Sequence, residues 1–436
     1  MPEARGPSVI PAISAAARPR PRAVAHVSSV GLMLLAVFAF LLIGRAPEIF
    51  VFLLPLRLLL VTGLLVIAWA ATVPRKPFPP FWDEPEVRLT LYLLGYAVVT
   101  IPFSVWPSES TEFVGGFVKI VVFVIVVVHC VRSQRHVTTI VWAVIAAALL
   151  IQYAILTGYG GLNAQTGGLG AQEGKRAWVT GTYDPNDIAF VMACVLPLAF
   201  FRAVSARGMA RYVAGTVAFL CLVTTIRTGS RGGFITMVVV GAILIVKSRR
   251  GVRWILAGLA VAAMLAFASG EYWDRIGTIW GATSSDVSSY DVAGLDAARW
   301  QTWKKMAALA IGYLPFGSGA GTVMTAEGTT HGAGVKWETA HNALLQIAVE
   351  MGIPGVAIFV ALLYGAIRSC RRLVRAARDR PELNKMTWMA HAVETSLYAY
   401  IAGAFALSQA YAPILYLLLG LTACLRRIAQ RAQTHA

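Results

Sequence analysis

The chain has 436 residues, of which 57% are hydrophobic and only 14% are charged, although its net charge is +17. A soluble chain of this size would carry roughly a quarter charged residues, so the composition excludes an ordinary soluble protein. The apolar residues occur in long runs, as in a polytopic membrane protein, and the basic residues are then expected to mark cytoplasmic loops and not a nucleic-acid surface.

Residues 1–26 are rich in Pro, Arg and Ala. Each proline removes a backbone hydrogen-bond donor, so the alternating Arg and Pro residues at 18–22 predict an irregular segment. We interpret residues 1–26 as a disordered cytoplasmic N-terminus, and the first apolar run after it as an uncleaved membrane anchor.

Twelve apolar runs follow, and each is predicted to be a helix because hydrocarbon cannot satisfy open backbone groups. They cover about 28–44, 49–73, 87–103, 113–131, 137–157, 188–204, 211–226, 233–247, 253–269, 342–367, 390–408 and 412–425. The expected organisation is therefore helices 1–9 within 27–269, an outer helical subdomain over 270–341, helices 10–12 within 342–425, and a cytoplasmic tail over 426–436.

The distribution of basic residues fits this count. If the N-terminus is cytoplasmic and the helices alternate, 26 of the 38 Lys and Arg residues fall on the inner side, 10 on the outer side, and two inside the membrane. The short outer loop at 104–112 has no basic residue, whereas the inner loop at 368–387 has seven. The positive-inside rule thus favours twelve helices with both chain ends in the cytoplasm.

One local pattern suggests chemistry at the point where the outer subdomain enters the tenth helix. His341-Asn342 is followed, after nine residues, by Gly352-Ile-Pro-Gly355. A histidine at a membrane surface has a pKa near the operating pH and suits a general base, although an isolated interfacial histidine usually has only a structural role.

With its spacing, this pattern resembles the O-antigen ligase and O-antigen polymerase superfamily, whose ligases share His, then Asn, Ser or Gln, nine residues, and Gly-x-x-Gly. Three further stretches resemble the same family, and the resemblance as a whole covers most of residues 90–425. They are Thr228-Gly-Ser-Arg231-Gly, Arg299 with Trp303, and Pro315-Phe-Gly-Ser-Gly-Ala-Gly321. The chain departs from the family at Trp303, because the ligase pattern has Leu four residues after this arginine.

The resemblance implies a C-type glycosyltransferase architecture and glycosyl transfer outside the cytoplasm of a Gram-negative-type cell, with the enzyme in the inner membrane. The donor would be a glycan on undecaprenyl diphosphate and the acceptor a sugar hydroxyl of lipid A-core. His341 would be the base, and Arg231 and Arg299 would stabilise the diphosphate without a metal or other cofactor. The proposed direct displacement would invert the anomeric configuration.

The residues themselves agree with a lipid diphosphate, which requires cations at the outer interface. Arg231 opens the eighth helix, where backbone N–H groups already favour anions, and Arg227 lies four residues earlier, where it is alternatively a snorkelling helix-end arginine. Lys119 and Arg57 lie about 9 Å and about 12 Å below the outer ends of their expected helices, so they are candidate substrate contacts or a buried pair with other partners.

Three carboxylates lie near these motifs. Asp184 and Asp187, just before the sixth helix, are more typical of a helix cap than of a metal site, and no metal is expected. Glu338 precedes His341 by three residues and is a candidate to orient the imidazole, and Asn342 is a candidate substrate contact.

The sequence therefore predicts an all-α polytopic enzyme, with O-antigen ligase as the favoured activity. O-antigen polymerase and protein O-oligosaccharyltransferase are alternatives within the same chemistry. A transporter of lipid-linked glycan is the alternative of another class, but the two halves show no matching pair of Gly/Pro-broken helices.

Overall fold

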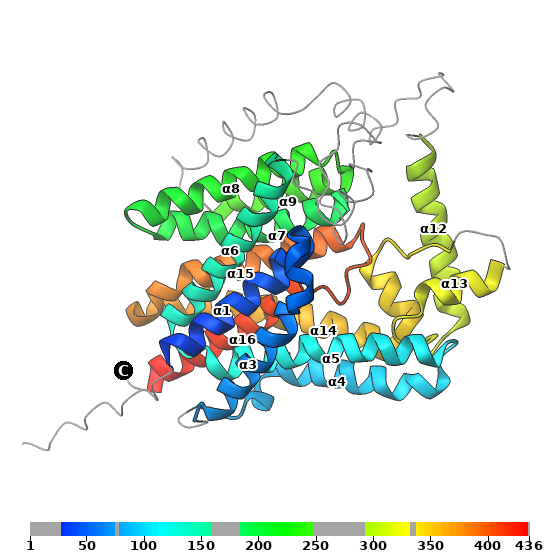
Figure 1. Ribbon diagram of the computed structural model, residues 1–436, viewed down its shortest axis with the longest axis horizontal. Helices are drawn as coiled ribbons and strands as arrows, with labels where there is room; N and C mark the ends of the chain where they lie inside the picture. The colour runs from blue at the N-terminus through cyan, green and yellow to red at the C-terminus, as the bar shows by residue number, and fades with distance from the viewer. Residues whose placement is uncertain (1–27, 75–77, 158–183, 248–292, 332–336, 435–436) are drawn as a thin grey trace, which may run out of the picture.

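The computed structural model describes residues 28–74, 78–157, 184–247, 293–331 and 337–434, which form helices joined by turns and no β-strand (Figure 1). The α-helices are α1 (Ser29–Gly44), α2 (Ala46–Ile49), α3 (Leu58–Thr72), α4 (Pro85–Thr100), α5 (Pro107–Cys130), α6 (Gln134–Thr157), α7 (Pro185–Ser205), α8 (Met209–Arg227), α9 (Arg231–Lys247), α12 (Ala293–Gly312), α13 (Val323–His331), α14 (Ala343–Asp379), α15 (Thr387–Ala404) and α16 (Pro413–Thr434). Short 3-10 helices are η1 (Val51–Leu56), η2 (Phe81–Asp83), η3 (Ile101–Phe103) and η6 (Pro381–Met386).

Eleven of the twelve predicted apolar runs coincide with described helices, and the ninth, 253–269, lies outside the described residues. Within the described part, seven helices are long and apolar enough to cross a membrane by length and composition. The all-α membrane class is thus confirmed, whereas the count of twelve spans and the outer position of 270–341 stay predictions.

Two helices extend beyond their apolar runs. Helix α14 continues to Asp379 and α16 to Thr434, although the sequence predicted a loop from 368 and a tail from 426. Cys370, Leu373 and Ala377 are buried, and this spacing of three to four residues keeps one apolar stripe against the bundle. Helix α14 therefore continues beyond residue 367, where the predicted apolar run ends.

The expected continuous helix over 49–73 is broken at Arg57, which corrects the prediction that Arg57 lies within a regular helix. Its φ of 45° and ψ of 44° separate η1 from α3, and its carbonyl accepts hydrogen bonds from the first turn of α3. Pro55 lies just before the break and has no N–H to continue an α-helical ladder. Lys119 also lies deeper than predicted, about 18 Å from the start of α5, because that helix begins at Pro107.

The core is built around α7 and α16. Every residue from Ile188 to Phe201 and from Ile414 to Leu425 is buried, so both helices are surrounded on all sides. Helix α7 packs mainly on α8 and α15, and α16 on α5, α14 and α15. A separate small apolar cluster joins α12, α13 and the start of α14, which lie at one end of the long helices in Figure 1.

The helix ends form two groups at opposite ends of the bundle. At one end of the bundle, Arg426 Nε donates to Glu84 Oε2 (3.0 Å) and Arg427 Nη2 to the Pro79 carbonyl (2.7 Å). At the other end, Gln409 Nε2 donates to Asp187 Oδ1 (2.6 Å). We call the end with Arg426 and Arg427 the basic end, and the end with Asp187, where α14 begins just after His341, the histidine end.

Candidate active site

The site begins where α9 starts at the histidine end. Ser230 precedes the helix, and its Oγ donates to Asn186 Oδ1 of α7 (2.8 Å) and accepts from the Gly233 N–H (3.1 Å). A Cβ on Gly233 would lie 2.5 Å from the Cβ of Ala189, so the glycine lets α9 approach α7 closely. Arg231 is therefore held in the first turn of a helix whose N-terminal position is fixed by α7.

A narrow cleft brings Arg299 of α12 to this same helix start. Its lining residues come from α7, α9, α12 and the end of α15, and they are Asn186, Phe190, Ser230, Gly232, Gly233, Thr236, Arg299, Gly403, Ala406 and Leu407. Two of the predicted arginine motifs thus meet across one cleft, although they are far apart in the sequence. Both arginines are partly buried, a setting in which a guanidinium binds anions more strongly than at an open surface.

The His341-Asn342 pair forms the N-terminus of α14. Asn342 Oδ1 accepts hydrogen bonds from the N–H groups of Leu344 and Leu345 (2.9 and 3.0 Å), and Nδ2 donates to the Phe405 carbonyl (3.0 Å). The Asn342 side chain is thus a helix cap with its donor also engaged. His341 is half-buried with a φ of 45°, and its carbonyl accepts from Trp303 Nε1 (3.2 Å), so the backbone that carries the imidazole is fixed from both sides.

A segment between α15 and α16 connects these parts, and the sequence analysis did not identify it. Besides the Phe405 carbonyl, which binds Asn342, the Phe405 ring contacts Trp303 edge to face at 5.1 Å between centroids. Gln409 binds Asp187, and the Ala410 N–H donates to Gln346 Oε1 of α14 (3.3 Å). Residues 405–412 therefore link α7, α12 and α14. The only sequence signal was polar Ser408-Gln409 between two apolar runs.

The Pro315–Gly321 motif binds the backbone on both sides of Gly352, the glycine that follows the His341-Asn342 pair in the sequence pattern. Helix α14 is interrupted at Gly352, whose φ is 56°. The interruption leaves backbone groups without intrahelical partners, and the motif satisfies them. Ser318 and Gly319 donate to the carbonyls of Val349 and Glu350 (2.8 and 3.0 Å), and the Pro315 carbonyl accepts from the Ile353 N–H (3.0 Å).

The predicted carboxylates have clear partners. Asp184 caps α7, since its Oδ1 accepts from the N–H groups of Asn186 and Asp187 (2.6 and 2.8 Å). Glu338 binds α12, accepting from Thr302 Oγ1 (3.0 Å) and pairing with Lys305 Nζ at 3.8 Å. These contacts hold the segment before His341 against α12.

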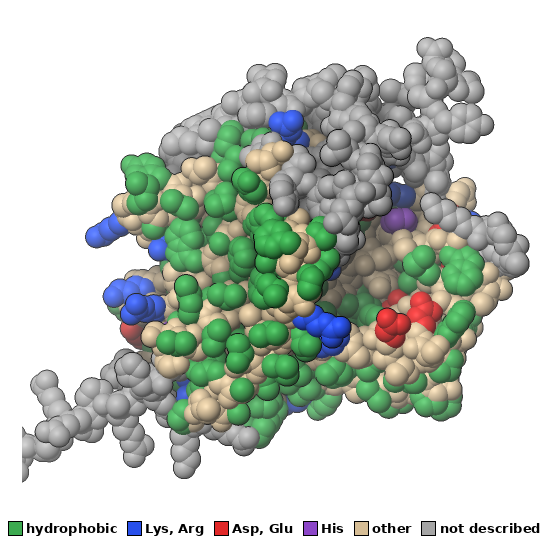
Figure 2. Space-filling model, in the orientation of Figure 1, with side chains coloured by type: hydrophobic (Ala, Val, Ile, Leu, Met, Phe, Trp, Pro, Cys, Tyr) green, Lys and Arg blue, Asp and Glu red, His purple; other side chains and the backbone are tan. Residues whose placement is uncertain are grey.

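The remaining predicted cations lie on the surface of the described structure. Arg227 is exposed at the end of α8, Lys119 is exposed along α5, and Arg57 is exposed at the break before α3. Figure 2 shows a recess on one face of the molecule with a histidine, basic and acidic side chains around it.

The long apolar helices define an integral membrane protein, and the polar residues described above lie together at one end of its bundle. Residues 216–360 match the family model described as O-antigen ligase, a span that includes α9, α12 and the first half of α14. This region is therefore similar to the O-antigen ligase family, which supports the resemblance drawn from the motifs. A comparison with curated proteins finds no match to the chain. The family supports a membrane glycosyltransferase of the ligase or polymerase type.

Proposed function

We propose that the protein is an O-antigen ligase of the inner membrane. It transfers a glycan from undecaprenyl diphosphate to a sugar hydroxyl of lipid A-core on the periplasmic side. The observation that carries this proposal is the convergence of the α9 start, Arg299 and the His341-Asn342 pair at residues 405–412. A base and two arginines at one end of the bundle are what transfer from a lipid diphosphate to a hydroxyl requires.

In the proposed reaction, His341 accepts the proton of the acceptor hydroxyl as its oxygen attacks the anomeric carbon. The bond from that carbon to the diphosphate oxygen breaks, and undecaprenyl diphosphate leaves with both electrons of the bond. Arg231 and Arg299 neutralise the charge that develops on the leaving group, so no metal ion is needed. Because attack comes from the face opposite the diphosphate, the anomeric configuration is inverted.

The other predicted residues have supporting roles in this proposal. Asn342 and Glu338 hold the backbone on both sides of His341 through the contacts described above. Arg227, Lys119 and Arg57 receive the donor's diphosphate from the lipid phase. The histidine end of the bundle then faces the periplasm, and the basic end faces the cytoplasm.

The decisive experiment measures donor binding and transfer separately for two variants of the purified full chain. His341→Ala should abolish transfer and leave binding of an undecaprenyl diphosphate glycan nearly intact, because the base acts on the acceptor. Loss of general-base help costs about 10²–10⁴ in rate. Arg231→Ala should weaken donor binding and transfer together, by on the order of 1–3 kcal/mol, because it contacts a charge present before the reaction.

Arg211→Ala is the matched control and should change neither donor binding nor transfer. Arg211 is exposed at the start of α8, at the basic end of the bundle. Equal loss of donor binding in His341→Ala and Arg231→Ala would make His341 a diphosphate ligand. A normal rate in His341→Ala would refute the assigned site. The reaction is run with a chelator present and offers lipid A-core and a second lipid-linked glycan as competing acceptors. Extension of the second glycan alone would identify a polymerase.

A further inference from the structure

A larger pocket lies at the basic end of the bundle, away from the candidate active site. Its volume is about 670 Å³, and it is formed by the start of α6, the ends of α7 and α9, and the η6–α15 junction. Three of these helices, α7, α9 and α15, also line the cleft described above near their opposite ends: α7 starts there with Asn186 and ends here with Ser205. Because α7 has 21 residues, the two sites are about 30 Å apart.

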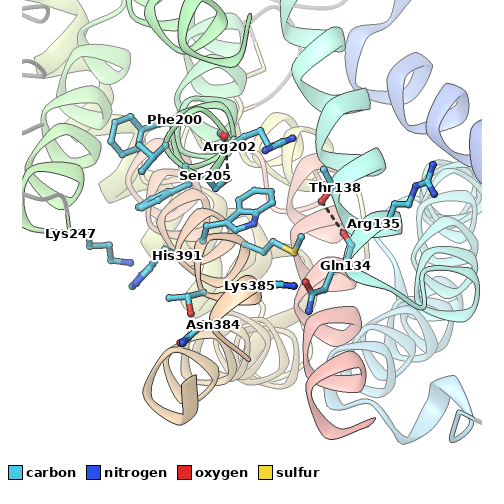
Figure 3. Close-up of a pocket in the computed structure, with 15 residues that line it drawn as sticks. Gln134, Arg135, Thr138, Phe200, Arg202, Ser205, Lys247, Asn384, Lys385 and His391 are labelled. Carbon is cyan, nitrogen blue, oxygen red and sulfur yellow. Dashed lines mark hydrogen bonds between the residues drawn. The ribbon is translucent and has the colours of Figure 1, made fainter. Parts of the chain in front are cut away.

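The pocket is basic. Among the described residues, its lining includes Arg135, Arg202, Lys247 and Lys385 and no Asp or Glu, and Figure 3 shows these four side chains around it. Lys247 Nζ is paired with Glu394 Oε2 at 2.6 Å, and Glu394 also binds Arg371. The net positive charge of the pocket therefore comes from the other three residues.

Arg202 is held in a form suited to a phosphate group. Its guanidinium lies over the rings of Trp142 and Trp388, at 5.4 and 5.6 Å from their centroids. Its Nε is buried and has no hydrogen-bond partner among the described residues, and the same is true of His391 Nδ1, which lies 3.9 Å from Glu394 Oε2. The two rings hold the guanidinium at the pocket wall, and a planar guanidinium matches the oxygens of a phosphate group. Buried polar atoms without a hydrogen-bond partner are rare in proteins.

We propose that this pocket binds the phosphate of an anionic glycerophospholipid, such as phosphatidylglycerol, from the leaflet at the basic end. Phe200, Phe201, Trp388 and Met389 give it apolar walls beside the cations, which suit a glycerol backbone and the upper acyl chain more than a free anion. Basic pockets between membrane helices at the cytoplasmic side are typical sites for such headgroups. The lipid would join α6, α7, α9 and α15, and would thereby fix α7, α9 and α15, whose opposite ends line the cleft of the candidate active site. This proposal does not depend on the glycosyl-transfer reaction.

The test compares the full chain in nanodiscs of phosphatidylcholine alone with nanodiscs that also contain phosphatidylglycerol, by native mass spectrometry of retained lipid and by thermal unfolding. We expect selective retention of phosphatidylglycerol and a higher Tm in its presence. The double variant Arg135→Gln/Lys385→Gln should bind it roughly tenfold more weakly, since a hydrogen bond to a charged group contributes about that factor. Both residues are exposed, so the fold should persist. Arg202→Gln should have at least as large an effect.

The double variant Arg378→Gln/Arg380→Gln is the matched control. It removes two exposed charges at the same end of the bundle but outside the pocket, and it should retain phosphatidylglycerol normally. Equal retention of both lipids, or equal loss in the two double variants, would overturn the proposal. If inorganic phosphate raises the Tm as much as phosphatidylglycerol does, the occupant is a free anion and not a lipid. If Arg202→Gln fails to fold, the exposed double variant still decides.

Discussion

Asn342 uses both its oxygen and its nitrogen within the protein. The oxygen caps α14 and the nitrogen binds the Phe405 carbonyl, and the residue is only 5% exposed. The next residue toward the N-terminus, His341, has a positive φ, which is uncommon for a residue other than glycine and is maintained only when the surroundings require it. Asn342 therefore helps to hold the backbone that carries the imidazole.

We expect Asn342→Ala to lower the free energy of unfolding by about 0.5–2 kcal/mol for the lost cap, and to slow transfer as well. Asn342→Asp retains a cap but removes the donor to the Phe405 carbonyl, so its transfer should be slowed with less loss of stability. Thermal unfolding and transfer rate are measured side by side.

Ser28→Ala is the control, because Ser28 caps α1 in the same way, with its Oγ accepting from the Gly31 N–H at 3.1 Å. It should affect stability without affecting the transfer rate. A normal rate in both Asn342 variants would show that the cap does not position His341.

At the scale of elements, the interruption of α14 divides it into a short half that begins at the site and a long half that runs to the basic end. A Cβ on Gly352 would lie 2.1 Å from the Pro315 carbonyl oxygen, so only glycine combines the positive φ with this close approach. Gly317, Gly319 and Gly321 of the partner motif also have positive φ angles, and the Cβ of any side chain there would meet an atom within 2.5 Å.

Gly352→Ala should therefore lower the free energy of unfolding by more than about 1–3 kcal/mol, the usual cost of a strained backbone conformation, because a steric clash is added. Gly365→Ala in the same helix is the matched control, since nothing lies within 4 Å of its Cβ position. The control should be neutral or stabilising by up to about 1 kcal/mol. Thermal or denaturant unfolding of both variants measures the difference, and equal effects would contradict this account.

Sequence patterns predicted the helices well because a membrane segment needs a long apolar run with all its backbone groups bonded internally. The histidine motif was also visible, since both of its ends use residues with special backbone roles: the cap Asn342 and the kink Gly352. The break at Arg57 and residues 405–412 were not predicted. The former falls inside an unbroken apolar run, and the latter acts partly through main-chain groups such as the Phe405 carbonyl, which no side-chain pattern reveals.

At the scale of the whole molecule, the described helices connect a histidine end with a basic end, and the orientation of the bundle in the membrane follows from which end is outside. Cysteine placed at Gln301 of α12 should react with a membrane-impermeant thiol reagent in intact spheroplasts, and cysteine at Arg378 of α14 should react only after lysis. Both positions are exposed, and the five native cysteines are buried and should give little background. Labelling of position 378 alone in intact spheroplasts would reverse the orientation.

The interruption at Gly352 also lets the two halves of α14 point in different directions. Bilayers differ in thickness by a few ångströms, and a long membrane helix adapts by tilting. In an unbroken α14, such a tilt would swing His341 with the rest of the rod. Here the short half is anchored to α12, α13 and residues 405–412, and the Pro315–Gly321 motif bridges the turn at Gly352 by hydrogen bonds to both halves. The direction of the long half therefore does not by itself fix the position of the backbone that carries His341.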